Sequence, residues 1–218
     1  IYYMNNKSFE TIITDSQHCQ RNWDLSKNIK AEDIETLKVA VKQCPSKQNR
    51  VFYKALFIQD RSTIELFHST TLSYTIQWDP YVATYNDQTL ANLLVVLVRD
   101  RDYTENPRVE YENDSGVKKR DDVGDYKVKR DEDRALGVAG GYITLAAHML
   151  GYKTGFYDGQ HNQDLTKELL GEDVLLVIGI GHPDATKHYR DSHDNVFAGE
   201  DGLSRFYKFD KNINVEEI

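Results

Sequence analysis

The stretch of sequence that decides the fold reads GVAGGYITLAAHMLGYKTGFYDGQ over residues 137–160 and continues with LLVIGIGHP over residues 175–183. Its first part repeats apolar residues at helical spacing, which predicts a long helix over residues 131–150. The repeating residues are Ala139, Ile143, Ala146, Ala147 and Leu150. Gly140 and Gly141, in the middle of this helix, permit a close approach by another helix or a ligand ring.

Strands follow this helix. Residues 152–157 read as a strand that ends at the turn Asp158-Gly159, and residues 174–180 form an apolar run. Residues 93–98 form another such run. Uninterrupted apolar runs of this length are typical of central strands covered on both faces. We therefore expect a sheet whose central strands are buried.

Helices and strands are intermixed in the rest of the chain. Periodicity predicts helices over residues 5–15, 31–44, 62–71 and 164–170, and a strand over residues 51–59. This mixture favours the α+β or α/β class, with a mixed sheet flanked by helices. The 218 residues suit a single domain spanning 1–218.

Residues 99–134 differ in character from the rest of the chain. They are rich in charge and carry few large apolar side chains, so they bury little surface, and we expect a loop. Two interpretations stay open: an insertion without a role, or a lid over an active site. Tyr103, Tyr111 and Tyr126 are candidate lid aromatics.

The composition argues against several classes of function. A net charge of -8 disfavours a nucleic-acid partner, and no apolar run is long enough to span a membrane. Two cysteines, Cys19 and Cys44, are too few for a disulfide framework, so we expect free thiols and a cytoplasmic protein. The histidines lack metal-ligand spacing, so we expect no metal site. Gly179-Ile180-Gly181 is a lone GxG, too short for a dinucleotide fingerprint.

Four segments carry candidate site residues. HCQRNWD, residues 18–24, precedes the helix at 31–44, and CPSKQN, residues 44–49, ends it. A helix stop alone would also explain the second segment. The third segment is the Asp158-Gly159 turn, and the fourth is the tail, which ends in NVEEI at residues 214–218.

In their order and spacing these segments resemble the nitroreductase family of FMN-dependent enzymes. The resemblance runs from about residue 16 to residue 218, apart from the charged insertion. It implies a nitroreductase-like α+β fold with a mixed central sheet. It also implies an intertwined homodimer with FMN at the subunit interface, in which residues 139–150 form part of the dimer core and the tail is exchanged.

The resemblance assigns the first segment to the flavin phosphate, ribityl chain and pyrimidine edge. Gln17, His18 and Cys19 fall at the family's Arg-Arg/His-Ser positions, and Arg21 falls at its final basic position. Arg21 would face the N1/O2 edge, where a cation stabilises the reduced flavin. Gln17 and Cys19 depart from the pattern, because an amide grips phosphate less tightly than a guanidinium and a thiol hydrogen-bonds weakly.

The resemblance carries further residues over from the other segments. The family's Pro-Ser-x-x-Asn sequence is matched, although the Gln-Pro-Trp that commonly follows it is absent. The family's Glu-Gly pair, whose backbone N–H points at flavin N5, corresponds to the Asp-Gly turn. A C-terminal arginine of the family is missing. The carried-over residues are Pro45, Ser46, Asn49, Asn86, Gln88, Asp158, Gly159, Lys208 and Lys211.

The resemblance implies an FMN-dependent oxidoreductase. NADH or NADPH would reduce the flavin, which would then reduce a nitroaromatic, quinone or flavin-type acceptor by a ping-pong mechanism. Residues 74–85, rich in aromatics, would contact the acceptor. Two alternatives stay open. The chain could be a specialised relative of the dehalogenase or flavin-destructase type, or a flavin-binding or storage protein without turnover, as Gln17 and the missing arginine suggest.

Overall fold

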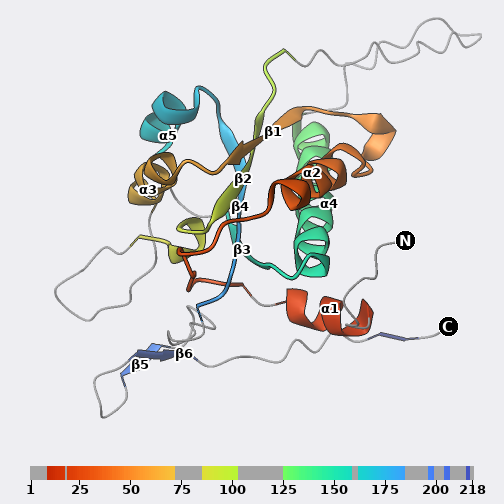
Figure 1. Cartoon of the computed structure of the whole chain (residues 1–218). Helices are drawn as coiled ribbons and strands as arrows, with labels where there is room; N and C mark the ends of the chain where they lie inside the picture. The colour runs from red at the N-terminus through yellow and green to blue at the C-terminus, as the bar shows by residue number, and fades with distance from the viewer. Residues whose placement is uncertain are drawn as a thin grey trace, which may run out of the picture.

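The computed structural model of the chain has a four-stranded sheet between two layers of helices (Figure 1). It describes residues 9–17, 19–71, 85–102, 125–158, 162–184, 196–198, 204–206 and 215–216. The helices are α1 (Phe9–Ser16), α2 (Ala31–Lys42), α3 (Arg61–Ser69), α4 (Asp125–Met149) and α5 (Gln163–Leu170), with the 3₁₀ turns η1 (Lys47–Asn49) and η2 (Asp87–Thr89). The strands of the sheet are β1 (Tyr53–Ile58), β2 (Leu93–Arg99), β3 (Lys153–Tyr157) and β4 (Val174–Gly181). A separate short pair comprises β5 (Val196–Ala198) and β6 (Ser204–Phe206).

The strand order of the sheet is β1-β2-β4-β3. The apolar runs β2 and β4 lie at its centre, which confirms their prediction as buried strands. Every neighbouring pair among these four strands is antiparallel, so the expected mixture of strand directions would need a strand other than these. The α+β class with a helix-flanked sheet is confirmed.

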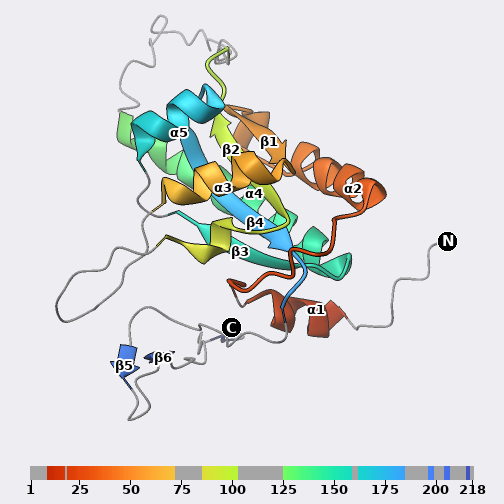
Figure 2. The same ribbon diagram turned by 60° about the vertical axis from the view of Figure 1, so that its left-hand side comes forward.

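Helices cover both faces of the sheet, and each face has its own core. Figure 2 shows α3 and α5 in front of the sheet and α4 behind it. Side chains of successive strand residues point to opposite faces. Leu93, Val95 and Leu97 therefore pack toward α2 and α4, whereas Leu94 and Val96 pack toward α3 and α5.

Helix α4 packs closely on the sheet because of a glycine. Ala139, Ile143 and Ala147 are fully buried in the core, as the periodicity predicts. A Cβ at Gly140 would lie 2.6 Å from the Phe156 ring of β3, so only glycine fits there. The close approach expected for this part of the helix is thus a contact with the sheet of the same chain.

Helix α4 begins at Asp125, earlier than the predicted start at residue 131. The last part of the expected charged insertion, residues 125–134, is therefore helical. The charged side chains of this part are compatible with a packed helix where they are paired. Both carboxylate oxygens of Glu132 accept hydrogen bonds from the Arg99 guanidinium, at 3.2 and 2.9 Å. Residues 103–124 of the insertion lie outside the described residues.

We predict that Gly140→Ala lowers the free energy of unfolding by about 1–3 kcal/mol, because the added methyl group overpacks the contact with Phe156. Gly137→Ala is the matched control, since its Cβ meets nothing within 4 Å. It should raise the free energy of unfolding by about 0.5–1 kcal/mol. Urea unfolding followed by circular dichroism measures both. Equal effects of the two substitutions would contradict the contact.

Candidate functional site

The first candidate segment lies against one end of the sheet. The backbone N–H of Gln20 donates to the carbonyl oxygen of Thr154 in β3 at 2.8 Å, and that of Asp24 donates to His182 O, just after β4, at 2.9 Å. The segment is thus held by backbone bonds at both ends. In this way the fold brings residues near Arg21 to the strand that leads to Asp158.

Asn86 and Gln88, two of the carried-over candidates, reach the same end of the sheet. The Trp23 indole N–H donates to Asp87 O at 2.7 Å, which ties the first segment to η2. Asn86 serves the local structure, because its side-chain oxygen accepts from the Gln88 N–H at 3.0 Å and its own N–H donates to the Thr71 hydroxyl at 2.9 Å.

Gln88 differs from Asn86 in what its side chain does. Its residue exposure is only 5%, and its Cβ and Cγ lie on Gly155 of β3. Its side-chain amide has no hydrogen-bond partner in the part of the chain that the structure describes. The amide is not among the fully buried side-chain atoms that lack a partner, so its nitrogen and oxygen keep contact with solvent. An unpaired amide at this place is therefore free to bind a ligand with both a donor and an acceptor.

The third segment follows the other end of β3, because Tyr157 is opposite Val177 and so lies about 10 Å along the strand from Thr154. Asp158 is exposed directly after β3, and its neighbour Gly159 lies outside the described residues. Beyond this turn, the Asn162 N–H donates to Thr70 O at 3.0 Å, at the C-terminal end of α3. The aromatic segment follows α3 and returns at Asn86, whose carbonyl oxygen lies 3.1 Å from His68 Nδ1. The first segment and η2 therefore meet at one end of the sheet, while Asn162, beyond Asp158, contacts the same end of α3 as Asn86.

The second segment lies at the opposite corner of the sheet. It leads into β1, where Tyr53 is opposite Arg99 of β2, whereas the bond from Gln20 to Thr154 lies at the level of Leu93. The separation is about 20 Å along the strands, and the three strand spacings from β1 to β3 add about 14 Å across the sheet. One copy of the chain does not unite this segment with the others.

Local contacts hold the second segment in place. The Ser46 hydroxyl donates to Arg50 O at 2.7 Å, and Lys47 Nζ lies 2.5 Å from the Asp131 carboxylate on α4. Asn49 has a φ of 51°, a left-handed conformation that asparagine tolerates better than most residues. Pro45 is exposed. The segment is thus more than a helix stop, because it also anchors α2 to α4.

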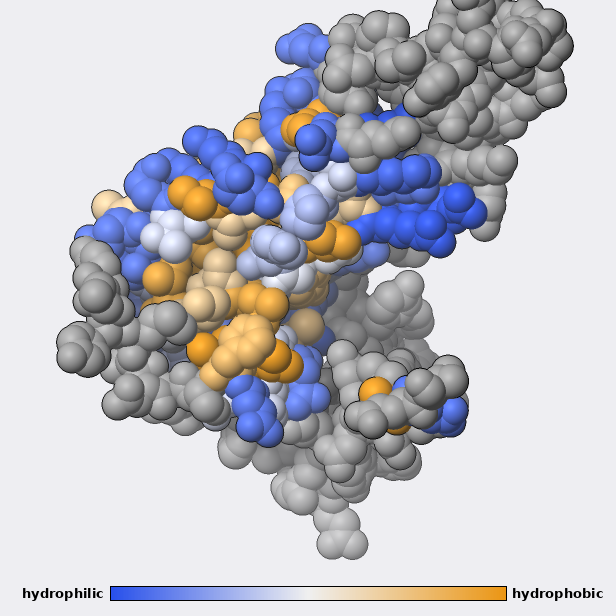
Figure 3. All heavy atoms as spheres, turned by 90° about the vertical axis from the view of Figure 1, so that its right-hand side faces the viewer, coloured by the Kyte–Doolittle hydropathy of each residue, from blue (hydrophilic) through white to orange (hydrophobic). Residues whose placement is uncertain are grey.

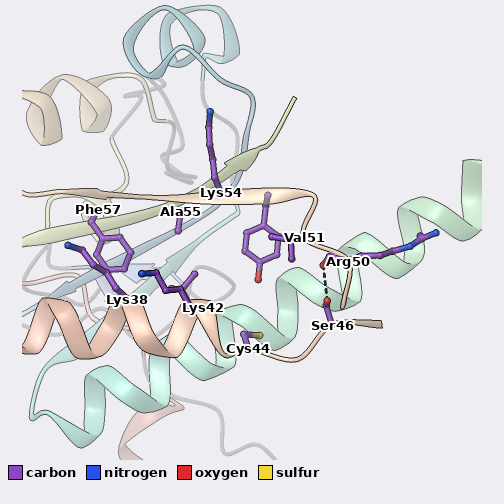
Figure 4. Close-up of a pocket in the computed structure, with 11 residues that line it drawn as sticks. Lys38, Lys42, Cys44, Ser46, Arg50, Val51, Lys54, Ala55 and Phe57 are labelled. Carbon is purple, nitrogen blue, oxygen red and sulfur yellow. Dashed lines mark hydrogen bonds between the residues drawn. The ribbon is translucent and has the colours of Figure 1, made fainter. Parts of the chain in front are cut away.

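A cavity of about 400 Å³ lies beside this segment, between α2 and the outer edge of β1 (Figure 4). It is lined by Lys38, Val41, Lys42, Cys44, Ser46, Arg50, Val51, Tyr53, Lys54, Ala55 and Phe57. Burial raises the pKa of the Cys44 thiol and raises the pKa of Tyr53 to about 12. Cys44 is therefore a protonated, unreactive thiol at neutral pH.

The remaining candidates of the first segment are less informative. Gln17 is exposed after α1, while Cys19 and Arg21 are half-buried and Cys19 is a free thiol. His18, Lys208 and Lys211 lie outside the described residues. Within the described ranges, no cluster of histidine, cysteine and carboxylate side chains could hold a metal ion. No helix in them is long and apolar enough to cross a membrane.

The architecture is that of the nitroreductase fold, as comparison with solved structures shows. A nitroreductase family protein from Clostridium novyi NT superposes with a TM-score of 0.59 at 15% identity, covering 83% of this chain and 87% of its own. Nitroreductase A from Vibrio parahaemolyticus gives 0.60 at 17% identity, covering 95% and 79%. A nitroreductase from Desulfovibrio desulfuricans, solved with FMN, gives 0.56 at 15% identity, covering 87% and 94%.

These identities establish likeness of fold. No family model matches the sequence, and no curated protein matches it. The resemblance to nitroreductases inferred from four segments is thus confirmed by the structure, at the level of the fold.

We predict that Asn86→Ala lowers the free energy of unfolding by about 1 kcal/mol, because it removes the side-chain oxygen that caps η2. Asn86→Asp keeps an oxygen acceptor at this position and should retain most of the stability. Chemical unfolding of the two variants beside the wild type measures the difference. Equal losses for Ala and Asp would show that the cap is not the stabilising contact.

Proposed function

We propose that the chain is an FMN-dependent oxidoreductase that uses NADH or NADPH as its electron donor. The observation that carries this proposal is the Gln88 side chain, which belongs to a residue only 5% exposed and whose amide makes no hydrogen bond to the described residues, at the end of a nitroreductase-type sheet where the first segment and η2 meet. The likeness of fold supports the same class of cofactor.

The chemistry of this end of the sheet fits a flavin. The pyrimidine edge of a flavin has a ring N–H between two carbonyl oxygens, and the Gln88 amide offers the complementary acceptor and donor. Arg21, from the neighbouring segment, would supply a cation at the N1/O2 edge. Asp158 and Gly159, at the end of β3, would supply backbone N–H groups near N5. Gln17, His18 and Cys19, with Lys208 and Lys211 from the tail, would hold the phosphate and ribityl chain.

Bound FMN would supply two-electron chemistry, accepting hydride from the nicotinamide and reducing the second substrate. The protein would bind and orient the ring and stabilise its reduced, anionic form through Arg21. The acceptor would be a nitroaromatic, a quinone or a flavin. Its contacts would come from the aromatic segment, which leaves the described region at Thr71 and re-enters it at Tyr85, close to Gln88.

The site is proposed to form between two copies of the chain. Pro45, Ser46 and Asn49 lie too far from Gln88 to serve the same flavin within one chain, so a second copy would supply them. The structure also leaves an apolar stripe for this copy on α4, in which Val138, Tyr142 and Met149 are each more than 40% exposed. Figure 3 faces the side on which α2 and α4 lie, and apolar side chains reach the surface there.

The proposed dimer would use only one face of the helix in residues 139–150, which are expected to form part of its core. Ala139, Ile143 and Ala147 are already buried against the sheet of their own chain. Only the opposite face of α4 remains for the partner. Phe9 and Ile13 of α1, exposed by 61% and 47%, add apolar surface near this helix.

We predict that purified protein binds FMN, and that its visible flavin bands bleach on anaerobic addition of NADH or NADPH. Gln88→Ala should weaken FMN binding by roughly tenfold, the value of one hydrogen-bonded group. Gln59→Ala is the control, because Gln59 is exposed on the loop before α3. Fluorescence titration of FMN measures both affinities.

Each contrary result of this experiment has a definite meaning. Protein that takes up no FMN would overturn the proposal and leave only the fold. Bound flavin that does not bleach with either nucleotide would instead favour a storage protein or a specialised relative. Equal FMN affinities of the Gln88 and Gln59 variants would remove Gln88 from the site.

We predict that two defective variants restore each other in a mixed dimer. Gln88→Ala and Asn49→Gly alter the two parts of the proposed site, and glycine keeps the positive φ of residue 49 without strain. In a mixed dimer one site carries both changes and the other carries neither. One tight FMN site per two chains is expected from titration of doubly tagged heterodimers. No recovery would place the site within a single chain.

A further inference from the structure

The sheet face that α3 and α5 cover carries glycines instead of side chains at one position of β3 and at two positions near the end of β4. Gly155 of β3 lies directly opposite Gly179 of β4 in the antiparallel register. Gly181 is two residues further along β4, so it points to the same face as Gly179. We call these three residues the glycine floor. Two of them, Gly179 and Gly181, are the glycines of the GxG that is too short for a dinucleotide fingerprint.

Each glycine of the floor has backbone or side-chain atoms pressed against it. A Cβ at Gly155 would lie 2.5 Å from Gln20 O and 3.1 Å from Gln88 Cβ. A Cβ at Gly179 would overlap Gln88 O and lie 3.0 Å from Ala91 Cβ. Real Cβ atoms do not approach other atoms this closely, so any side chain would displace what lies above it.

The atoms above the floor belong to the candidate cofactor segments. At Gly181 a Cβ would overlap the Asn92 side-chain oxygen and lie 2.9 Å from the Trp23 ring. Trp23 in turn donates its indole N–H to Asp87 O. The first segment and η2 therefore rest directly on the sheet and on each other, with no side chain of the sheet between them at these glycines.

We infer that Gly179, with Gly155 opposite it, is a positioning residue that sets the location of the Gln88 amide for ligand recognition. This inference rests on the proposed function, because the ligand is the flavin. Gly179 has no side chain to touch the ligand, so it acts through Gln88. The backbone oxygen of Gln88 is the atom that a larger residue at 179 would push away from the sheet.

The deciding experiment is a double-mutant cycle. Gly179→Ala should weaken FMN binding about tenfold in the wild-type background, since it misplaces one hydrogen-bonding amide. In a Gln88→Ala background the same substitution should change FMN affinity less than twofold, because the group it misplaces is already gone. Gly137→Ala, in open space on α4, is the control and should leave the affinity unchanged in both backgrounds.

A second readout needs no flavin. The chain has two tryptophans, so Trp78→Phe leaves Trp23 as the sole indole. Gly179→Ala should shift the Trp23 emission to longer wavelength, because displacement of η2 breaks the bond to Asp87 and exposes the ring. If the wild-type protein binds no FMN, the proposed function fails, while this emission shift still tests the floor.

Two results would overturn the inference. Unchanged Trp23 emission in folded Gly179→Ala would show that the floor does not set η2, and equal losses of FMN affinity in the two backgrounds would show that Gly179 does not act through Gln88. If Gly179→Ala fails to fold, Trp23→Phe takes its place in the cycle, because it releases η2 without adding atoms. It should then weaken FMN binding only when Gln88 is present.

Discussion

The structure depends on the burial of β2 and β4 on both faces of the sheet. Residues 93–98 of β2 are 0% exposed, and burying each such Leu or Val contributes about 1.5–3 kcal/mol. This requirement places α2 and α4 on one face and α3 and α5 on the other. Removing the helices from either face would expose a central strand to water. The helical cover of the faces is therefore constrained, whereas the segments at the ends of the sheet are not constrained in this way.

The candidate site occupies an end where helical cover gives way to polypeptide backbone. Glycine makes this possible, because Gly155 and Gly179 let Gln20 and Gln88 lie directly on the strands. Elsewhere interdigitated side chains fill the space between layers. Here the sheet itself fixes the position of the segments, which suits a site that must present polar groups at fixed places.

Assembly of two copies would complete the proposed site. The second candidate segment is anchored to α4 through the ion pair of Lys47 and Asp131, far from Gln88. Within one chain it has a structural task only. With a second copy docked on the exposed stripe of α4, this segment would also contact the cofactor of that copy. The residues of the segment would then serve both stability and cofactor binding.

The sequence by itself determined the class of fold, because hydrophobic periodicity and apolar runs mark helices and buried strands wherever they pack. It also predicted candidate segments around Arg21 and Gln88, which the structure brings to one end of the sheet, and around Asp158, which follows the other end of β3. Only the tertiary structure separated the roles of Asn86 and Gln88 and placed Ser46 at the opposite corner. It also showed that the two glycines of the lone GxG belong to the glycine floor, on which the first segment and η2 pack. Those distinctions depend on which atoms meet across the sheet, and contacts between residues distant in sequence leave no local pattern.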